Sequence, residues 1–182
     1  RQAPTFRDQR TSILAGDGDL PEQIADAIAA MQGSTLAIQG PPGTGKTYVS
    51  ALAIARLVAA GKRVAISSNS HKAIENLLVA TAERMSVEKV PGLLAQKVED
   101  QAPVPPHERI QQVTRNDDPE IDIAAVVGGT AWHHALHETN AFDYIFIDEA
   151  GQVSVANLMA MSRCAENIVL VGDPMQLPQD RK

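Results

Sequence analysis

The glycine-rich segment at residues 40–47 constrains the fold of this chain more than any other feature of its sequence. Its letters, GPPGTGKT, satisfy the pattern G-x-x-x-x-G-K-[ST], in which backbone N–H groups surround a phosphate. The apolar residues 35–39 precede the segment, and an almost uncharged stretch, residues 46–60, follows it. This context predicts a strand, a phosphate-binding loop and a helix, which a chance glycine turn would not supply.

Each residue type in this loop has a physical role. The glycines let the backbone wrap closely around a phosphate, and the start of the following helix adds a favourable dipole. Lys46 supplies a positive charge for the β- and γ-phosphates, and the Thr47 hydroxyl can bind magnesium. The sequence therefore predicts that ATP or a related nucleotide binds here with Mg²⁺. The predicted nucleotide-binding residues of this segment are Gly40, Pro41, Pro42, Gly43, Thr44, Gly45, Lys46, Thr47 and Tyr48.

The pattern of apolar residues predicts an α/β fold with a parallel sheet sandwiched by helices. The predicted strands are continuous apolar runs, which is typical of strands covered on both faces, and they alternate with helical patterns. Strands are predicted at residues 35–39, 64–68, 123–127, 144–147 and 168–171, and helices at residues 21–31, 46–60, from His71 onward, near Trp132 and at residues 156–164.

The chain is predicted to form one main domain, residues 19–182, preceded by an arm or linker at residues 1–18 in which the charges alternate. Prolines and mixed charges predict an irregular excursion at about residues 85–120. Gly61 is expected to end the helix that follows the phosphate loop.

Composition limits the classes of protein that this chain can represent. The single cysteine, Cys164, excludes an internal disulfide or a cysteine-ligated metal cluster and is expected in the core. The net charge of −6 and the aromatic content of 3% argue against a generally nucleic-acid-binding surface, although a local groove remains compatible with them. No apolar run has the length of a membrane span and the first residues lack a signal-peptide pattern, so a cytoplasmic protein without membrane contact is expected.

Two adjacent carboxylates follow the apolar run at residues 144–147. Asp148 and Glu149 would lie at the carboxyl end of this strand, where ligands of parallel sheets bind. Asp148 is predicted to hold Mg²⁺, and Glu149 is predicted to act as the general base that activates water. The alternative is a solvated acidic pair at a strand end, which the upstream phosphate loop disfavours.

A third loop with polar residues follows the last predicted strand. It reads Gly172-Asp173-Pro174-Met175-Gln176, and by itself Gly-Asp-Pro indicates only a turn. After a parallel strand, however, Asp173 and Gln176 would be placed to reach the γ-phosphate, and Gln176 joins Lys46 and Glu149 as a predicted catalytic residue.

These three segments resemble motifs I, II and III of superfamily 1 helicases. The likeness is greatest to the branch that contains RNA-surveillance helicases and nuclease-helicases of Okazaki-fragment processing, and in particular to bacterial proteins that join a RecB-like nuclease to such a helicase. It covers about residues 20–80 and 122–179. The resemblance implies a RecA-like first motor domain that couples ATP hydrolysis to movement on single-stranded DNA, with RNA possible and with five-prime to three-prime polarity. It also implies that the strand before Gly172 lies between the strands of the phosphate loop and of Asp148.

Further residues acquire roles through this resemblance. Gln23 fits the glutamine that reads adenine. Residues 67–73 fit motif Ia, which grips the nucleic-acid strand, and Thr130 and Trp132 resemble motif Ic. Without the family, a helix N-cap would be the preferred interpretation of the motif Ia residues, and core packing is an equal alternative for Trp132. The predicted nucleic-acid contacts are Ser68, Asn69, Ser70, His71, Thr130 and Trp132.

Three histidines, His133, His134 and His137, follow motif Ic. A zinc site is one interpretation, because His133 and His137 could share a helix face. No cysteine or H-E-x-x-H pattern completes such a site, so exposed histidines are the favoured interpretation.

The sequence departs from the family at its end. Helicases of this kind have a second motor domain that contributes an arginine to the γ-phosphate, whereas this sequence stops at Lys182, directly after motif III. We therefore expect a second motor domain, and a nuclease domain, outside this chain. The alternative function is a binding module in which ATP switches a protein partner without unwinding. A P-loop kinase is disfavoured by Glu149 and motif III.

Overall fold

A computed structural model describes residues 3–10, 12–14, 18–100 and 106–173. Within them, seven strands form one sheet in which every neighbouring pair is parallel. The order across the sheet is β1 (Thr35–Gln39), β7 (Ala165–Gly172), β6 (Phe142–Ile147), β2 (Val64–Ser67), β5 (Val126–Gly128), β3 (Leu94–Lys97) and β4 (Ile110–Val113). The predicted α/β fold is confirmed.

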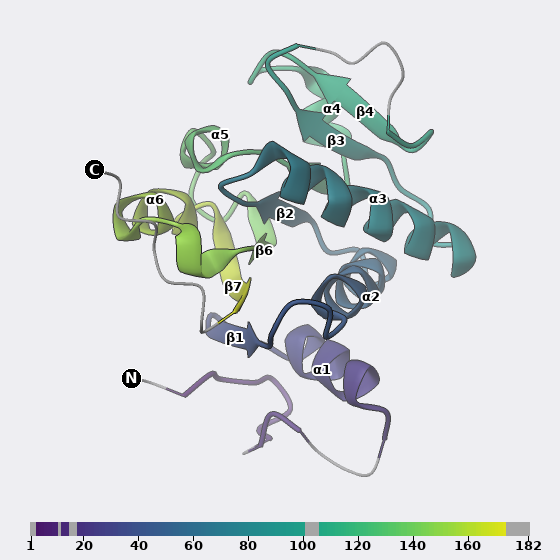
Figure 1. The fold of residues 1–182 in the computed structure, drawn as a ribbon, viewed down its shortest axis with the longest axis vertical. Coiled ribbons are helices and arrows are strands. Elements are labelled where there is room, and N and C mark those ends of the chain that lie inside the picture. The colour runs from purple at the N-terminus through teal and green to yellow at the C-terminus, as the bar shows by residue number, and fades with distance from the viewer. Residues whose placement is uncertain (1–2, 11, 15–17, 101–105, 174–182) are drawn as a thin grey trace.

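Helices cover both faces of the sheet (Figure 1). One face packs against α1 (Leu20–Ala29), α2 (Lys46–Ala59) and α3 (His71–Val87), and the other against α4 (Pro119–Ile123), α5 (Ala131–Ala135) and α6 (Val155–Ser162). Successive strand residues belong to different cores: Val64 and Ile66 face the first set of helices, and Ala65 faces the second. This division explains the continuous apolar runs, because both faces of each central strand are buried.

The helix after the phosphate loop is largely buried, which fits its lack of charges. It begins after Gly45, whose φ of 81° no β-branched residue would adopt readily, and Gly61, at φ 74°, directly follows its last turn. The end that was predicted at Gly61 is therefore confirmed. The helix fixes Lys46 and Thr47 in its first turn, directly at the edge of the sheet.

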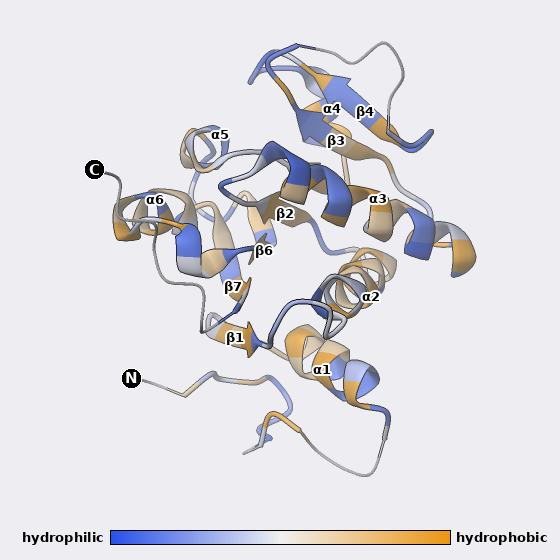
Figure 2. Cartoon of the chain, viewed as in Figure 1, coloured by the Kyte–Doolittle hydropathy of each residue, from blue (hydrophilic) through white to orange (hydrophobic). Residues whose placement is uncertain are grey.

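The segment predicted to be irregular contains two strands, β3 and β4, so that prediction is wrong for them. Both are short and carry polar residues, and both are drawn mostly in the hydrophilic colour in Figure 2. Gln96 and Gln112 are nevertheless buried, and Gln112 donates a hydrogen bond to Gln96 across the two strands at 3.4 Å. Polar residues that satisfy each other inside a sheet leave no apolar pattern to detect.

A second difference lies at Ile123, which was predicted to begin a strand. It ends the short helix α4, and the strand β5 begins only at Val126. Pro119 occupies the first turn of α4, and the Asp118 side chain caps this helix by accepting from the Glu120 N–H at 3.2 Å.

The described part of residues 1–18 lies along the end of α1. Arg7 donates a backbone hydrogen bond to Ala30 at 2.7 Å, and Gln32 donates one to Thr5 at 2.9 Å. In the described part of the chain, no helix combines the length and apolar character needed to cross a membrane.

Candidate functional site

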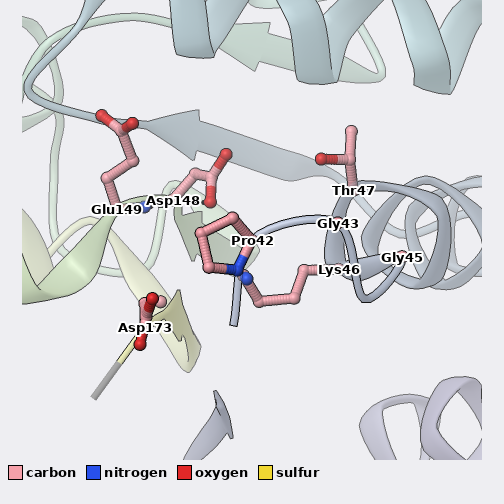
Figure 3. Close-up of a pocket in the computed structure, with 9 residues that line it drawn as sticks. Pro42, Gly43, Gly45, Lys46, Thr47, Asp148, Glu149 and Asp173 are labelled. Carbon is pink, nitrogen blue, oxygen red and sulfur yellow. Dashed lines mark hydrogen bonds between the residues drawn. The ribbon is translucent and has the colours of Figure 1, made fainter. Parts of the chain in front are cut away.

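A hollow of about 450 Å³ opens at the carboxyl ends of β1, β6 and β7 (Figure 3). Its volume is in the range of small-molecule sites. Its lining residues come from all three loops singled out in the sequence, namely Pro42, Gly43, Gly45, Lys46, Thr47, Asp148, Glu149, Gly172 and Asp173. β7 lies between β1 and β6, as the resemblance implied, so the third loop starts next to the phosphate loop.

The backbone of the phosphate loop adopts a conformation that requires glycine. Gly43 and Gly45 both have φ of 81°, in the left-handed region that other residues rarely occupy. At Gly40, an added Cβ would lie only 2.7 Å from the Thr44 hydroxyl oxygen. The Thr44 hydroxyl in turn donates to the Pro41 carbonyl at 2.8 Å. The loop is therefore held in shape by its own residues.

Lys46 is held by the loop that it follows. Its Nζ donates to the carbonyl oxygens of Gly40, at 2.6 Å, and Pro41, at 2.8 Å. These contacts keep the ammonium group over the loop rather than in solvent. A phosphate bound to the loop would compete with these carbonyls for the same ammonium protons.

Asp148 directly follows β6, and its backbone N–H donates to the Ser67 carbonyl at the end of β2, at 2.9 Å. Its side chain accepts a hydrogen bond from the Glu149 N–H at 2.9 Å. Burial raises the pKa of Asp148, while that N–H and the nearby Lys46 charge oppose the shift. A bound cation would offset the cost of burying this carboxylate. Figure 3 shows the Thr47 hydroxyl oriented toward Asp148 across the hollow, and both side chains present oxygen atoms, the donors that Mg²⁺ prefers.

Glu149 has an unusual backbone, with φ of 52° in a residue that is not glycine. This conformation turns its side chain away from Asp148 and toward the end of β2, where the Ser68 hydroxyl lies 3.5 Å from Oε2. The sequence had assigned Ser68 to the nucleic acid only, and this contact with the predicted general base was missed. No signal in the sequence distinguishes these two roles, because the contact joins residues far apart in the chain.

Several predicted nucleotide contacts lie apart from this hollow. The Gln23 amide donates to the Gly18 carbonyl, and Tyr48 is half-exposed with the Arg84 guanidinium 5.2 Å from its ring centre. Neither belongs to the described residues that line the hollow. Gly40, Pro41 and Thr44 shape the phosphate loop but do not line the hollow. Gln176 falls outside the described residues.

The predicted nucleic-acid residues divide into two groups. Ser70 caps α3 by accepting from the Ala73 N–H at 3.3 Å, and Asn69 donates to the Gln152 carbonyl after β6. His71, Thr130 and Trp132, in contrast, line a common hollow of about 240 Å³. Trp132 is 79% exposed, which excludes core packing and leaves its ring available for stacking.

The three histidines after motif Ic are not exposed as the sequence predicted. His133 and His134 are buried, and His137 is half-buried. The short helix α5 lies against the end of β2, where His134 bonds the Ile66 carbonyl at 2.9 Å. Cys164, by contrast, is buried as predicted, and burial raises the pKa of its thiol to about 12.

The chain is similar to proteins named DNA replication ATP-dependent helicase/nuclease DNA2. It is 30% identical over 189 residues to the one from Saccharomyces cerevisiae, with 97% of this chain and 12% of that protein covered. It is 30% identical over 185 residues to the one from Gallus gallus, with 96% of this chain and 18% of that protein covered. The chain thus spans less than a fifth of the length of these relatives. The resemblance to helicases that the motifs indicated is confirmed.

The fold is shared with a solved structure, the UvsW helicase from Bacteriophage T4. The TM-score is 0.58 at 12% identity, over 85% of this chain and 52% of that one. At this identity the match supports the fold alone. Residues 21–179 match the family described as AAA domain, which includes all three loops around the hollow. The chain therefore belongs to the AAA domain family.

Proposed function

We propose that this chain is the first motor domain of a helicase, which binds ATP with Mg²⁺ and couples its hydrolysis to movement along single-stranded DNA. The observation that carries the proposal is the meeting of Lys46 and Thr47 with Asp148 and Glu149 around one hollow. This set combines a phosphate-binding cation, two magnesium ligands and a carboxylate suited to activating water. The names of the DNA2 relatives supply the inference that the nucleic acid is DNA.

In this site Lys46 would exchange the Gly40 and Pro41 carbonyls for phosphate oxygens. Thr47 and Asp148 would hold Mg²⁺ between them, and Glu149 would accept the proton of the attacking water while Ser68 orients its carboxylate. When bound, ATP supplies the phosphoanhydride bond that is cleaved, and Mg²⁺ neutralises part of the negative charge of its phosphates. Gln176 as sensor of the γ-phosphate and Gln23 as adenine reader stay predictions.

The nucleic-acid surface would be formed by Trp132, Thr130 and His71, together with Lys97 from β3 in the same hollow. An exposed tryptophan beside a cation matches how proteins hold single strands, because every base has a face to stack on. Such a local site can hold a strand although the net charge of the whole chain is −6. Ser68, Asn69 and Ser70 would act on this surface mainly by fixing the start of α3 and the loop after β6.

Two features distinguish this proposal from an ATP-switched binding module without motor activity. The glutamate at the end of β6 is suited to hydrolysis, and the loop that carries it is joined to motif Ia by the bonds from Ser68 and Asn69. ATP chemistry and strand contact could thus affect each other. A second motor domain and a nuclease domain outside residues 1–182, and five-prime to three-prime movement, belong to the same proposal.

The proposal is tested by the ATPase activity of a protein that contains this domain and its second motor domain. We expect single-stranded DNA to stimulate turnover severalfold. We expect Lys46→Ala to abolish tight ATP binding in a titration and to remove the stimulated activity, because it deletes the side-chain charge aimed at the phosphates. ATP hydrolysis that single-stranded DNA does not stimulate would favour the ATP-switched binding module. Unchanged nucleotide affinity in Lys46→Ala would contradict the phosphate-loop assignment.

Trp132 provides a direct test of the nucleic-acid surface. It is the single tryptophan of the chain, so its fluorescence reports on this position alone. We expect single-stranded DNA to quench this fluorescence, and Trp132→Ala to weaken DNA binding by about 5- to 150-fold, the range for losing one stacked base. Leu136→Ala, at another exposed position in the same hollow, is the matched control. An unchanged affinity for Trp132→Ala would remove this residue from the interface.

A further inference from the structure

Three histidine rings meet where α5 lies against the sheet. One ring nitrogen each of His133, His134 and His137 lies within 4.8 Å of the others. The Nε2 atoms of His133 and His137 are 3.2 Å apart. In a tetrahedral zinc site with Zn–N bonds of 2.0–2.1 Å, two ligand nitrogens are separated by about 3.3 Å. Two of the three rings are therefore already spaced as ligands of one ion.

The hydrogen bonds of the cluster fix where its lone pairs are. His133 Nδ1 lies 3.0 Å from the side-chain amide oxygen Oδ1 of Asn116, which can only accept, so Nδ1 carries the proton and Nε2 has the lone pair. In the same way His134 Nε2 donates to the Ile66 carbonyl at 2.9 Å, which leaves Nδ1 unprotonated. A ring nitrogen held by an outer hydrogen bond, with the other nitrogen free to bind, is the usual arrangement of a metal-binding histidine.

One of these lone pairs has no partner. The Nδ1 atom of His134 is buried and has no hydrogen-bond partner in the structure, and the residue is fully buried. An unpaired polar atom in the interior destabilises the folded state, because it loses its hydrogen bonds to water and gains none. A core histidine that served packing alone would be expected to satisfy both nitrogens, so this atom indicates a ligand.

The three rings lie in a buried environment that keeps them uncharged. Burial, reinforced by the neighbouring rings, lowers the pKa of His133 to about 3, and burial lowers that of His134 to about 4. Burial lowers the pKa of His137 as well. In the metal-free chain His137 Nε2 donates to the lone pair of His133 Nε2, so on metal binding the ring proton of His137 would move to its Nδ1. Lys97 near His133 and Arg63 near His137 oppose a further positive charge here, and the Asp122 carboxylate counters part of the effect of Arg63 on His137.

We propose that His133, His134 and His137 form a binding site for one zinc ion. The chemistry of the donors favours zinc, because imidazole nitrogens without thiolates or carboxylates suit it better than Mg²⁺ or Ca²⁺. His133 also lines the hollow of Thr130 and Trp132, from which the ion and a water as fourth ligand would enter. The ion would hold α5 and the turn after it together, at the end of β2 where His134 bonds Ile66. The proposal does not depend on the motor function.

The test is a zinc titration of the chain after removal of metal with EDTA, in competition with a chromophoric chelator. We expect one equivalent to bind with a dissociation constant of about 1 µM or tighter. Zinc should also raise Tm by about 3 °C or more, because it binds the folded state. No binding at micromolar concentration would overturn the proposal.

Two variants and a control locate the site. His137→Gln removes the half-buried ligand and leaves the His134–Ile66 bond intact, so we expect at least a 100-fold weaker affinity. Asn116→Ala should weaken zinc binding by about 10- to 100-fold through loss of ring orientation. His107→Gln, whose ring accepts from the Arg109 N–H away from the cluster, should bind as the unmodified chain does. Unchanged affinity in His137→Gln would place the zinc elsewhere and refute the site.

Ring nitrogen NMR decides the question without any variant. The chain has five histidines, and zinc should shift the ring nitrogens of His133, His134 and His137 while those of His71 and His107 stay in place. Shifts at His71 or His107 alone would contradict the proposal. Circular dichroism of each variant in EDTA checks that the fold is retained.

Discussion

Replacing Glu149 by glutamine should leave ATP binding intact and lower hydrolysis by about two orders of magnitude or more, the scale of losing a general base. The expectation applies to a protein that contains this domain and a second motor domain. Glutamine keeps the size of the side chain and can still contact the Ser68 hydroxyl, 3.5 Å from Oε2. It cannot accept a proton from water at neutral pH. Binding should therefore separate from turnover, which a general loss of structure would not produce.

A matched control tests whether charge alone explains the effect. Glu166 is exposed and lies near the start of β7, while the hollow lies at the other end of that strand. Glu166→Gln removes the same charge and should leave both binding and turnover unchanged. ATP affinity by titration and steady-state hydrolysis, measured for both variants, give the comparison. Turnover near the original value in Glu149→Gln would show that the base is another residue.

The site was predictable from the sequence where local rules determine it. Gly43 and Gly45 specify the loop because their left-handed backbone excludes most other residues, and the strand expected at residues 35–39 is β1 with the same bounds. Asp148 could be placed at the hollow because parallel strands bring their carboxyl ends to one edge of the sheet. These inferences require only a short segment and the direction of a strand.

Other features depend on contacts between distant segments, which one sequence does not reveal. Gln96 and Gln112 look like loop residues until they are seen to bond each other in the sheet. His134 was expected to be exposed because no pattern in the sequence completes a metal site around it, yet its ring reaches the Ile66 carbonyl of β2. Ser68 looked like a strand-gripping residue and contacts Glu149. In each case tertiary pairing overrides the local pattern.

The isolated chain, residues 1–182, should be a poor ATPase. The described residues that line its hollow include one cationic side chain, Lys46, and the three carboxylates Asp148, Glu149 and Asp173. Hydrolysis requires further positive charge in the site, because negative charge shifts toward the leaving and terminal phosphate oxygens in the transition state. Lys46 and magnesium supply only part of this positive charge. In related motors an arginine from the second domain supplies the rest.

The magnitude follows from what such arginines contribute. They accelerate phosphoryl transfer by about three to five powers of ten, equivalent to roughly 4–7 kcal/mol of barrier. A hollow that no second domain covers also leaves the nucleotide in contact with water, which weakens each electrostatic contact. We therefore expect weak binding of Mg–ATP, turnover barely above the Lys46→Ala background, and little change when single-stranded DNA is added.

Steady-state assays on purified residues 1–182, beside a protein that includes the second motor domain, test this prediction. The binding residues are all within the chain, so a fluorescent ATP analogue should still bind, and Lys46→Ala should abolish that signal. Retained binding without turnover would show that the phosphate loop is intact and that the missing factor is catalytic. Brisk, DNA-stimulated turnover by the isolated chain would mean that one domain supplies every charge the reaction needs, and the two-domain motor would have to be abandoned. Loss of binding as well as turnover would point instead to a nucleotide site that is completed only when the second domain closes over it.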